Sequence, residues 1–405
     1  MKWVYNLTIA CYHLLLIIAS PFNSKARRFL EGRKNWRNTL KDQLENKAEA
    51  DLIWIHAASQ GEYQQGLPII KELKKTKPDS FLLLSFFSPS GFDAFDQNEH
   101  VDAVTFLPLD YPKNVSAFID LVKPKVAVFV KYEFWYNYMI ELYRQKVPLL
   151  LISSIFRPDQ MFFHSMGKFY LNALKLTDHF FVQDEHSAAL LHHHGIDQVT
   201  ITGDSRLDQM LSIKEEVWTD DRVESFIGES LVIICGSIWP SDWDCLKRVI
   251  QQFSDIKVII APHEVSQEAL TLYGGVRWSQ YADEAGDLLL IDQVGSLKYL
   301  YRYADIAYVG GALRGAVHNT IEPAVYNIPI VIAEHTKNSK FNEVMDLKDH
   351  GGLVTFEDED ELFRIFEELI QDASKRKEMG QSNLDYVMRN SGATEKVMQK
   401  LQEYL

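Results

Sequence analysis

The segment from Gly310 to Val331, GGALRGAVHNTIEPAVYNIPIV, decides the fold. It follows a short apolar run, Ile306 to Val309, and passes through a glycine-rich loop and a polar helix start into a second apolar run near Ile330. Strand, loop, helix and strand in this order form the repeating unit of a parallel α/β sheet. Gly310 and Gly311, at the carboxyl end of the first strand, predict a loop whose backbone a ligand can approach closely.

The polar residues of the same segment predict a binding role. A helix that starts near His318 points unpaired N–H groups at an anion placed before it. Glu322 lies four residues after His318 on the same predicted helix face, where its carboxylate can accept hydrogen bonds from a ribose. A plain strand–loop–helix connection with Asn319 as the cap is the alternative interpretation.

The bulk composition bounds the class of protein. A chain of 405 residues is too long for one hydrophobic core and predicts two domains. The hydrophobic content of 46% and charged content of 24% are typical of a globular protein, and the net charge of −14 argues against a nucleic-acid binder. Three cysteines, Cys11, Cys235 and Cys245, form no disulfide framework and fit a reducing compartment.

The N-terminus departs from this average composition. Trp3 to Phe22 is mostly apolar and just long enough to span a bilayer, although Asn6, Thr8 and His13 also permit a helix that lies at the interface. The basic segment Lys25–Lys41 follows it and predicts a cytoplasmic main body and contact with anionic lipid headgroups. A cleaved signal peptide is the alternative, which the single preceding lysine and the basic segment disfavour.

Beyond the basic segment, apolar runs alternate with amphipathic helical stretches. Continuous apolar runs are typical of strands buried on both faces of a parallel sheet. The predicted strands are Leu52–His56, Phe81–Phe86, Ala103–Phe106, Val126–Val130, Leu149–Ile152, His179–Val182, Val199–Thr202, Leu231–Cys235, Val258–Ala261, Leu288–Ile291, Ile306–Val309, Ile330–Ile332 and Gly352–Phe356.

The pattern weakens between residues 205 and 228, which predicts a hinge there. The predicted architecture is a membrane anchor over residues 1–22 and two doubly wound, Rossmann-like α/β domains over residues 23–210 and 211–405, facing each other across a cleft. The tail from Glu361 onward predicts two or three polar amphipathic helices in the second domain.

Polar residues follow several strands of the first domain. Glu62, after Ser59 and Gly61, is placed to act as a general base, or merely to complement a helix N-terminus. A second group suits anion binding through backbone N–H groups or hydroxyls, with an ordinary capped turn as the alternative: Ser88, Ser90 and Gly91. Glu133 beside Trp135 resembles a sugar-contacting edge, or else packing. Arg206 offers a fork to an anionic substrate, with a surface ion pair as the alternative.

The second domain has its own candidates at strand ends. Gly236 and Ser237 follow a buried strand and can cradle a phosphate, and His263 follows the next strand. The run His192–His194 is better explained by the dipole at a helix C-terminus than by metal binding. With no DxD-like pair at a strand end, we expect no catalytic metal and no cofactor.

Taken together, these motifs resemble the Kdo transferase family, membrane-associated enzymes that add 3-deoxy-D-manno-octulosonic acid (Kdo) to a lipid A precursor. The resemblance covers nearly the whole chain. Besides the anchor and basic segment, it rests on HAASQGE (56–62), SPSG (88–91), YEFW (132–135), TGDSRLD (202–208), GSIWPSD (236–242), APHE (261–264) and GGALRGAVHNTIEP (310–323).

The resemblance implies a GT-B fold and a specific reaction. It implies a CMP-Kdo donor, a lipid IVA acceptor, metal-independent inversion, and attachment to the cytoplasmic face of the bacterial inner membrane. Glu62 matches the family's catalytic carboxylate and Glu133 a second functional one. The residues that fall on nucleotide-side motifs are Ser237, His263, Asn319 and Glu322. The chain departs from the family pattern at EHTKNSKFNE (334–343), which leaves donor contacts there open, and at Arg206, where a lysine is usual.

Two other functions fit the same fold. One is a GT-B enzyme that acts on a UDP-sugar, such as a lipid disaccharide synthase or an epimerase, and the other is a non-catalytic, membrane-tethered nucleotide-sugar binder. Binding of CMP rather than UDP distinguishes the first, and the turnover of a Glu62→Gln variant distinguishes the second.

Overall fold

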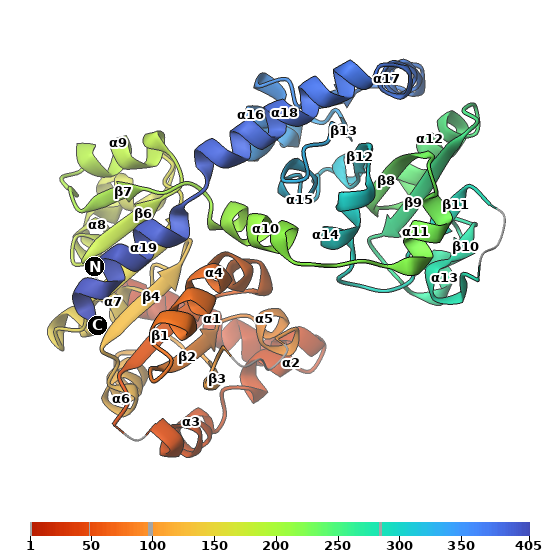
Figure 1. The fold of residues 1–405 in the computed structure, drawn as a ribbon. Helices are drawn as coiled ribbons and strands as arrows, with labels where there is room; N and C mark the ends of the chain where they lie inside the picture. The colour runs from red at the N-terminus through yellow and green to blue at the C-terminus, as the bar shows by residue number, and fades with distance from the viewer. Residues whose placement is uncertain (1, 48, 96–99, 283–285) are drawn as a thin grey trace. The chain divides into compact units, whose positions relative to one another are not determined.

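The protein is described by a computed structural model covering residues 2–47, 49–95, 100–282 and 286–405 (Figure 1). It divides into two compact units: unit 1 comprises Met1–Gln209 and Ser391–Leu405, and unit 2 comprises Met210–Asn390. Each unit contains one seven-stranded sheet in which every strand pair is parallel. The structure therefore confirms the predicted α/β class with two parallel sheets.

The sheet of unit 1 has the strand order β3-β2-β1-β4-β5-β6-β7. Its strands are β1 (Leu52–Ala57), β2 (Phe81–Phe86), β3 (Ala103–Phe106), β4 (Val126–Val130), β5 (Leu149–Ser154), β6 (His179–Val182) and β7 (Val199–Ile201). Its helices are α1 (Lys2–Ala19), α2 (Ser24–Glu31), α3 (Trp36–Leu44), α4 (Gln60–Thr76), α5 (Pro89–Asp93), α6 (Pro112–Val122), α7 (Tyr136–Arg144), α8 (Lys168–Leu174), α9 (Glu185–His193) and α19 (Ala393–Leu401). Helix α10 (Ser205–Glu215) contains the boundary with unit 2.

The sheet of unit 2 has the order β10-β11-β9-β8-β12-β13-β14. Its strands are β8 (Leu231–Ile238), β9 (Ile256–Pro262), β10 (Val276–Arg277), β11 (Leu288–Leu290), β12 (Ile306–Val309), β13 (Ile330–Ala333) and β14 (Leu353–Phe356). Its helices are α11 (Asp221–Ile227), α12 (Pro240–Ile250), α13 (Gln267–Leu270), α14 (Leu297–Leu300), α15 (Ile321–Ala324), α16 (Asn342–Asp349), α17 (Glu359–Gln371) and α18 (Ala373–Asn390). The two-residue strand β10 was not predicted, because it carries no apolar run.

The continuous apolar strands are buried on both faces, as their composition predicts. On β1, Trp54 packs into a core on one face of the sheet, while Ile53 and Ile55 pack into a second core on the other face. All six residues of β1 are buried. Such strands leave polar side chains only at their ends, which is where the candidate site residues lie.

The C-terminal helix α19 belongs to unit 1, whereas the prediction assigned all of residues 211–405 to the second domain. Val397, Met398 and Leu401 of α19 are buried in the core that contains Ile53. The carboxylate of Asp208 accepts hydrogen bonds from the backbone N–H groups of Gly392 (2.6 Å) and Thr394 (2.6 Å), which caps the start of the helix. The capping contacts of this helix join residues 184 and 186 positions apart, and its apolar contacts join residues still farther apart in the sequence.

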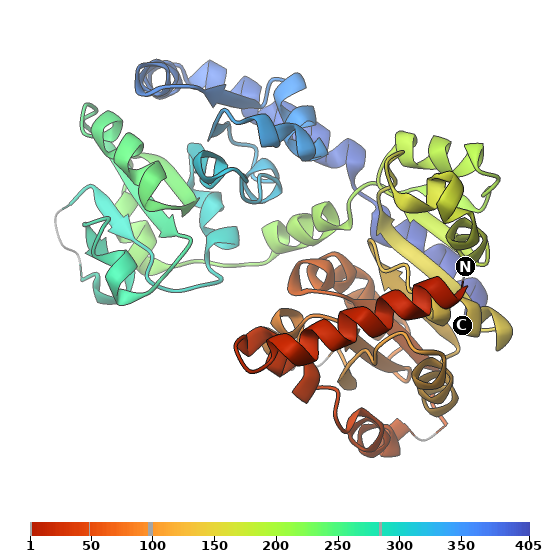
Figure 2. The same ribbon diagram turned by 180° about the vertical axis from the view of Figure 1, so that it is seen from behind.

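Helix α1, which lies in the segment predicted as a membrane anchor (residues 1–22), packs against the rest of unit 1 (Figure 2). Its role as an anchor stays a prediction. Three polar contacts tie it down: Tyr5 Oη to Asp110 Oδ2 (2.6 Å), Asn137 Nδ2 to Asn6 Oδ1 (2.9 Å), and His13 Nδ1 to Tyr111 Oη (3.2 Å). Two of the polar residues that weaken the apolar run, Asn6 and His13, are thus the ones that contact the protein. Length and composition would let α1 cross a membrane, and only Ile9 is buried.

Candidate active site

Each sheet has a point where the chain order reverses between neighbouring strands. In unit 1 these strands are β1 and β4, and in unit 2 they are β8 and β12. Ligands of open parallel sheets bind beyond the carboxyl ends of the strands at such a point. The segments that follow these four strands are HAASQGE, KYEFW, GSIWPSD and GGALRG, so the topology brings the predicted residues together in pairs.

A buried carboxylate cluster lies at the reversal point of unit 1. His56 Nε2 is 2.9 Å from Glu133 Oε2, and Trp135 Nε1 donates to the same oxygen at 2.6 Å. His56 Nδ1 lies 2.9 Å from Ser85 Oγ, which also accepts a hydrogen bond from Trp54 Nε1 at 2.8 Å. His56 is fully buried and Glu133 is 8% exposed, so this chain of hydrogen bonds holds a carboxylate in a fixed position.

Glu62 stands one turn into α4 and serves as part of its N-terminal cap. Its Oε2 accepts a hydrogen bond from the backbone N–H of Ser59 at 3.0 Å. Glu62 therefore does complement the helix N-terminus, which was the alternative interpretation, and this role does not exclude the role of a base. Burial, and after it the negative charge of Glu133, raise the pKa of Glu62, while His56 and the capping N–H groups oppose that rise. A carboxyl with a raised pKa accepts a proton more readily, so capping and base roles coexist in one residue.

The predicted anion-binding loop lies beside this cap. Ser88 Oγ accepts from Ser90 N at 3.3 Å and lies 2.7 Å from Ser90 Oγ, which is an ordinary capped turn at the start of α5. A Cβ on Gly91 would come within 3.0 Å of the backbone carbon of Ser59. Gly91 is therefore required for α5 to approach the loop that contains Ser59 and Gly61, and the two hydroxyls lie next to the Glu62 cap.

The guanidinium of Arg206 is paired with a carboxylate of the protein. Its Nε and Nη2 both donate to Asp204 Oδ2, at 2.8 and 2.5 Å. The two side chains are 25% and 13% exposed. The ion-pair alternative therefore describes Arg206 in this structure, because Asp204 two residues earlier captures the guanidinium.

In unit 2, a buried carboxylate organises the reversal point. Asp242 Oδ2 accepts from the backbone N–H of Trp239 (2.8 Å) and of Gly311 (3.2 Å), while Oδ1 accepts from Tyr308 Oη (2.9 Å). Asp242 is fully buried, and burial raises its pKa. It joins the loop after β8 to the loop after β12, which places Trp239 next to the glycine-rich segment.

Three rings are stacked at this junction. The ring of His263 lies 4.4 Å from that of Trp239 and 4.4 Å from that of His318, and Trp239 Nε1 lies 3.1 Å from His318 Nε2. The guanidinium carbon of Arg314 lies 4.1 Å above the Trp239 ring. Burial, and then His263, lower the pKa of His318 to about 4, so this imidazole is neutral near pH 7 and accepts the indole N–H.

The glycines of this site make room for the protein itself. A Cβ on Gly310 would lie 2.7 Å from Ile238 Cα, and one on Gly236 would lie 2.0 Å from Tyr301 Oη. Gly311 has φ +97° and faces the His318 ring. Ser237 has φ +52°, an uncommon conformation for a residue with a side chain. Gly310 therefore lets the loops after β8 and β12 pack closely, and Gly236 makes room for Tyr301. The approach of a ligand to these glycines stays a prediction.

Asn319 and Glu322 form a pair, but the predicted helix is only one turn long. Helix α15 spans Ile321–Ala324, and His318 precedes it. The prediction that His318 and Glu322 lie on one helix face is therefore wrong. Asn319 Oδ1 accepts from Ile321 N at 3.1 Å, and Asn319 Nδ2 donates to Glu322 Oε1 at 3.1 Å. A single turn carries little macrodipole, so an anion here depends on side chains more than on the helix.

Four residues of these two clusters were missed as functional candidates: His56, Asp242, Trp239 and Arg314. They all stand inside motifs quoted above, and buried polar contacts between distant segments give no local sequence signal. Among the residues that the structure describes, no three His, Cys, Asp or Glu side chains gather as a metal ion would require.

Known proteins resemble this chain in sequence and in fold. The family described as 3-deoxy-D-manno-octulosonic-acid transferase (kdotransferase) matches residues 32–209. The 3-deoxy-D-manno-octulosonic acid transferase of Haemophilus influenzae is 24% identical over 385 residues, 87% of each chain. The enzyme of that name from Aquifex aeolicus is 27% identical over 341 residues, 82% of this chain and 88% of that protein.

Solved structures share the fold at low identity. The UDP-GlcNAc 2-epimerase of Neisseria meningitidis has a TM-score of 0.63 and 14% identity, over 87% of this chain and all of the other. MurG of Acinetobacter baumannii has a TM-score of 0.56 and 12% identity, over 87% and 99% of the two chains. The two parallel sheets and these neighbours show the GT-B fold. The family match and the two transferases named above identify the protein as a glycosyltransferase. Within that class, the chain is a homologue of the Kdo transferases, which its residues 32–209 match as a family and which it resembles over most of its length.

Proposed function

We propose that this protein transfers Kdo from CMP-Kdo to the lipid A precursor lipid IVA, with inversion at the anomeric carbon and without a metal ion. The observation that carries the proposal is Glu62, a half-buried carboxyl beside the His56–Glu133 pair at the reversal point of unit 1. Homology with the Kdo transferases supplies the donor sugar and the class of acceptor.

Glu62 is the proposed base. A carboxyl whose pKa is raised toward neutrality is a better proton acceptor from a sugar hydroxyl than an ordinary one. The acceptor oxygen loses its proton to Glu62 and bonds to the anomeric carbon of Kdo. The bond from that carbon to the phosphate oxygen breaks, and its electron pair leaves with CMP. Glu133 keeps the field around Glu62 negative and is itself held by His56 and Trp135.

Ser59, Gly61, Ser88, Ser90 and Gly91 are the proposed acceptor side of the site. Gly91 brings the α5 turn against the Ser59 loop, so their hydroxyl and N–H groups lie near the proposed base. Small side chains there leave room for a sugar ring or a phosphate. Arg206 is committed to Asp204, so we assign it a structural role in holding the segment before α10.

Unit 2 is the proposed donor side. The stack of Trp239, His263 and His318 presents flat rings beside the Arg314 guanidinium, a combination that suits a nucleotide and its phosphate. Glu322, oriented by Asn319, is the proposed acceptor of ribose hydroxyl hydrogen bonds. Ser237 and the loop at Gly236, Gly310 and Gly311 lie at the same strand ends and would border the donor.

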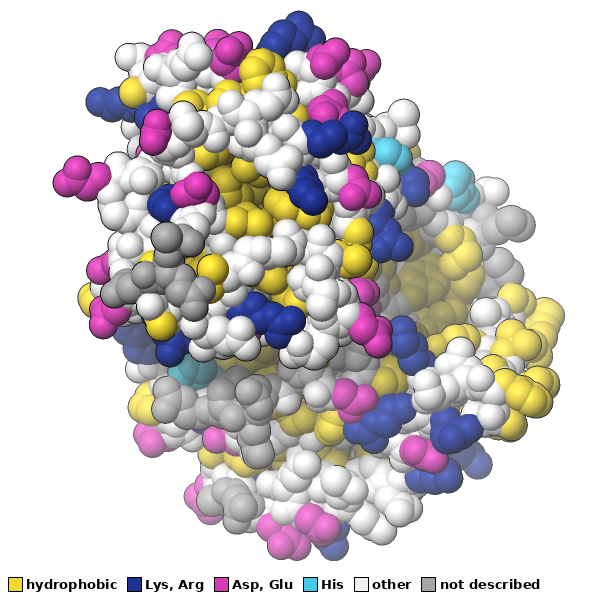
Figure 3. Space-filling model, turned by 90° about the vertical axis from the view of Figure 1, so that its right-hand side faces the viewer, with side chains coloured by type: hydrophobic (Ala, Val, Ile, Leu, Met, Phe, Trp, Pro, Cys, Tyr) yellow, Lys and Arg dark blue, Asp and Glu magenta, His cyan; other side chains and the backbone are white. Residues whose placement is uncertain are grey.

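We further propose that α1 attaches the protein to the cytoplasmic face of the inner membrane by lying in the interface. The face of α1 opposite its polar contacts is apolar and exposed, with Leu14 at 56%, Leu15 at 64% and Ile18 at 60%. Crossing the bilayer would break the contacts of Tyr5, Asn6 and His13 with unit 1, whereas lying flat keeps them. Figure 3 shows apolar side chains gathered with Lys and Arg at one edge of the molecule.

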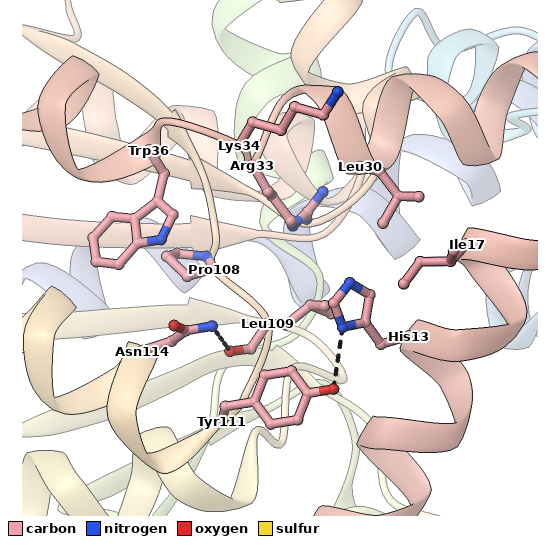
Figure 4. Close-up of a pocket in the computed structure, with 10 residues that line it drawn as sticks. All are labelled: His13, Ile17, Leu30, Arg33, Lys34, Trp36, Pro108, Leu109, Tyr111 and Asn114. Carbon is pink, nitrogen blue, oxygen red and sulfur yellow. Dashed lines mark hydrogen bonds between the residues drawn. The ribbon is translucent and has the colours of Figure 1, made fainter. Parts of the chain in front are cut away.

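The basic segment contributes five exposed charges to this attachment: Lys25, Arg27, Lys34, Arg37 and Lys41. The other two are used by the protein. Arg28 pairs with Asp93 at 2.5 Å, and the buried Arg33 donates to the carbonyls of Leu107, Phe29 and Phe87. Figure 4 shows Arg33 and Lys34 across a pocket of about 400 Å³ from His13, which points at Tyr111. Arg27 also donates to the carbonyls of Ser20 and Pro21 but keeps its charge at the surface, so all five exposed charges can attract anionic headgroups.

Transfer by the purified full-length protein tests the proposal. It would receive tetraacylated lipid A precursor and CMP-Kdo generated in situ, with EDTA present, and the product would be read by mass. A gain of one or more Kdo units is expected. No gain, from folded protein that binds UDP and not CMP, would refute Kdo transfer in favour of a UDP-sugar enzyme.

A variant with Leu15→Glu and Ile18→Glu tests the attachment through α1. It should lose vesicle binding, and unchanged binding would contradict the attachment.

A further inference from the structure

A second cavity in unit 1 lies between α1 and the carboxylate cluster. It has a volume of about 780 Å³, within the range of about 300–1,000 Å³ usual for ligand sites. One wall is α1, through Val4, Tyr5, Thr8 and Ile9. The opposite walls are the YEFW segment, residues 160–162 and helix α8. The side chains that line it are mainly aromatic and aliphatic.

Four polar groups that line this cavity are engaged within the protein, and the Glu133 carboxylate at its inner side contacts His56 and Trp135. Thr8 Oγ1 donates to Val4 O at 3.1 Å, and Gln160 Oε1 accepts from Arg157 N at 2.9 Å. Tyr5 Oη donates to Asp110, and Tyr170 Oη donates to the carbonyl of Phe134. These groups make no demand for water or for a polar ligand, so the cavity is suited to hydrocarbon.

The cavity is continuous with two features already described. At its inner side it reaches Glu133 and Trp135, which belong to the proposed catalytic cluster. At its outer side lie Val4, 38% exposed, and Met161, 58% exposed. Val4 is on the helix whose apolar face is proposed to lie in the membrane interface. The cavity therefore joins the hydrocarbon side of α1 to the reacting centre.

We propose that this cavity binds a fatty acyl chain of the acceptor, so that α1 is a wall of the substrate site as well as an attachment to the membrane. The inference rests on the proposed function, which supplies a lipid acceptor. An acyl chain matches the cavity because it is apolar, flexible and continuous with a headgroup that must reach Glu62. A bulk membrane lipid would fill the same space without any link to the acceptor, and the experiment separates the two.

The test compares wild type with Thr8→Trp, which fills the cavity from α1, and with Val217→Trp, which adds the same ring at a fully exposed position of unit 2, outside α1 and the cavity lining. Met161→Trp fills the cavity from the opposite wall if the α1 variant does not fold. Each full-length protein would be assayed with the tetraacylated precursor in mixed micelles and with its deacylated, water-soluble form. Vesicle binding and thermal unfolding would be measured in parallel.

We expect Thr8→Trp to raise KM for the acylated acceptor by about tenfold or more, since lost hydrocarbon contacts of a few methylenes have at least that effect. KM for the deacylated acceptor and vesicle binding should stay within about twofold of wild type, as should all three measurements for Val217→Trp.

Equal KM of wild type and both cavity-filling variants for the acylated acceptor would overturn the acyl-chain assignment alone. Weaker vesicle binding with unchanged KM would assign the cavity to a bulk lipid and overturn it too. Failure of wild type to transfer Kdo to either acceptor would overturn the proposed function, and this assignment with it.

Discussion

Glu62 carries two roles that a single substitution separates. Glu62→Gln keeps an oxygen that accepts the hydrogen bond from Ser59 N–H, which is 3.0 Å from Oε2 in the wild type. It removes the ability to take a proton. Loss of a general base typically lowers turnover by about 10²–10⁴-fold, which corresponds to about 2.7–5.5 kcal/mol of transition-state stabilisation. We therefore expect kcat to fall at least about 100-fold, with CMP affinity nearly intact.

The pKa of Glu62 also predicts the direction in which Glu62→Gln changes the free energy of unfolding. Because burial and Glu133 raise the pKa of Glu62, the folded state binds a proton more tightly than the unfolded state. The ionised carboxylate then weakens folding as pH rises above the unfolded value near 4.5. A neutral Gln avoids that penalty, so Glu62→Gln should be at least as stable as wild type at pH 7.5. Glu62→Ala also loses the cap, typically about 1 kcal/mol, or a Tm lower by about 2–4 °C.

The assay is Kdo transfer in single-turnover form, with CMP binding by calorimetry and unfolding by scanning calorimetry. Ser59→Ala serves as the control, because it removes the hydroxyl that donates to Glu62 Oε2 at 3.4 Å and leaves the carboxyl of the proposed base in place. Turnover of Glu62→Gln within about tenfold of wild type would refute the base assignment. A turnover loss in Ser59→Ala as large as that of Glu62→Gln would show that the cap, and not proton transfer, explains the effect.

Further predictions concern the neighbouring groups. Glu133→Gln should lower the pKa of Glu62 by removing a negative charge, so the acidic limb of the kcat/KM profile should move to lower pH; a shift to higher pH would contradict the coupling. Arg314→Ala, which leaves the Trp239 ring without its guanidinium, should weaken CMP binding about tenfold or more, whereas Arg314→Lys should retain part of it; calorimetry decides. His318 should titrate near pH 4 by NMR, and because that value lies below 6.5, stability should fall as pH drops from about 6.5 toward 4, less so in His318→Asn; a midpoint near 6.5 would contradict the buried neutral ring. Tyr5→Phe should destabilise the docking of α1 by about 1.5–3 kcal/mol, seen as faster hydrogen exchange in α1 than in wild type, because a buried carboxylate loses a 2.6 Å donor.

The sheets were predictable because their signal is local. Continuous apolar runs identify buried parallel strands, and β3, β4, β6 and β12 have the predicted bounds, residues 103–106, 126–130, 179–182 and 306–309. Strand ends were equally visible, since polar and small residues follow each apolar run. The candidate residues at these ends therefore include Glu62, Glu133, His263 and Asn319, with no structure needed to find the neighbourhoods.

Contacts between those neighbourhoods were not predictable. Whether a guanidinium is free or paired depends on the side chain facing it, so Arg206 was proposed for an anion although Asp204 holds it. The sequence also did not show that a Cβ on Gly310 or Gly236 would meet Ile238 or Tyr301, so the packing role of these glycines was not predicted. Sequence spacing likewise implied a shared helix face for His318 and Glu322, which the one-turn α15 does not provide.

The N-terminus shows most clearly which features the sequence determines and which only the tertiary structure decides. The sequence by itself determined an apolar segment, a basic segment after it and two parallel α/β sheets, because each depends on the composition of consecutive residues. The tertiary structure alone decided that Tyr5, Asn6 and His13 hold α1 against unit 1, and that α19 returns to unit 1 at the far end of the chain. The physical reason is that hydrogen bonds and apolar contacts depend on distance in space, and partners 98 or more residues apart leave no mark on either local pattern.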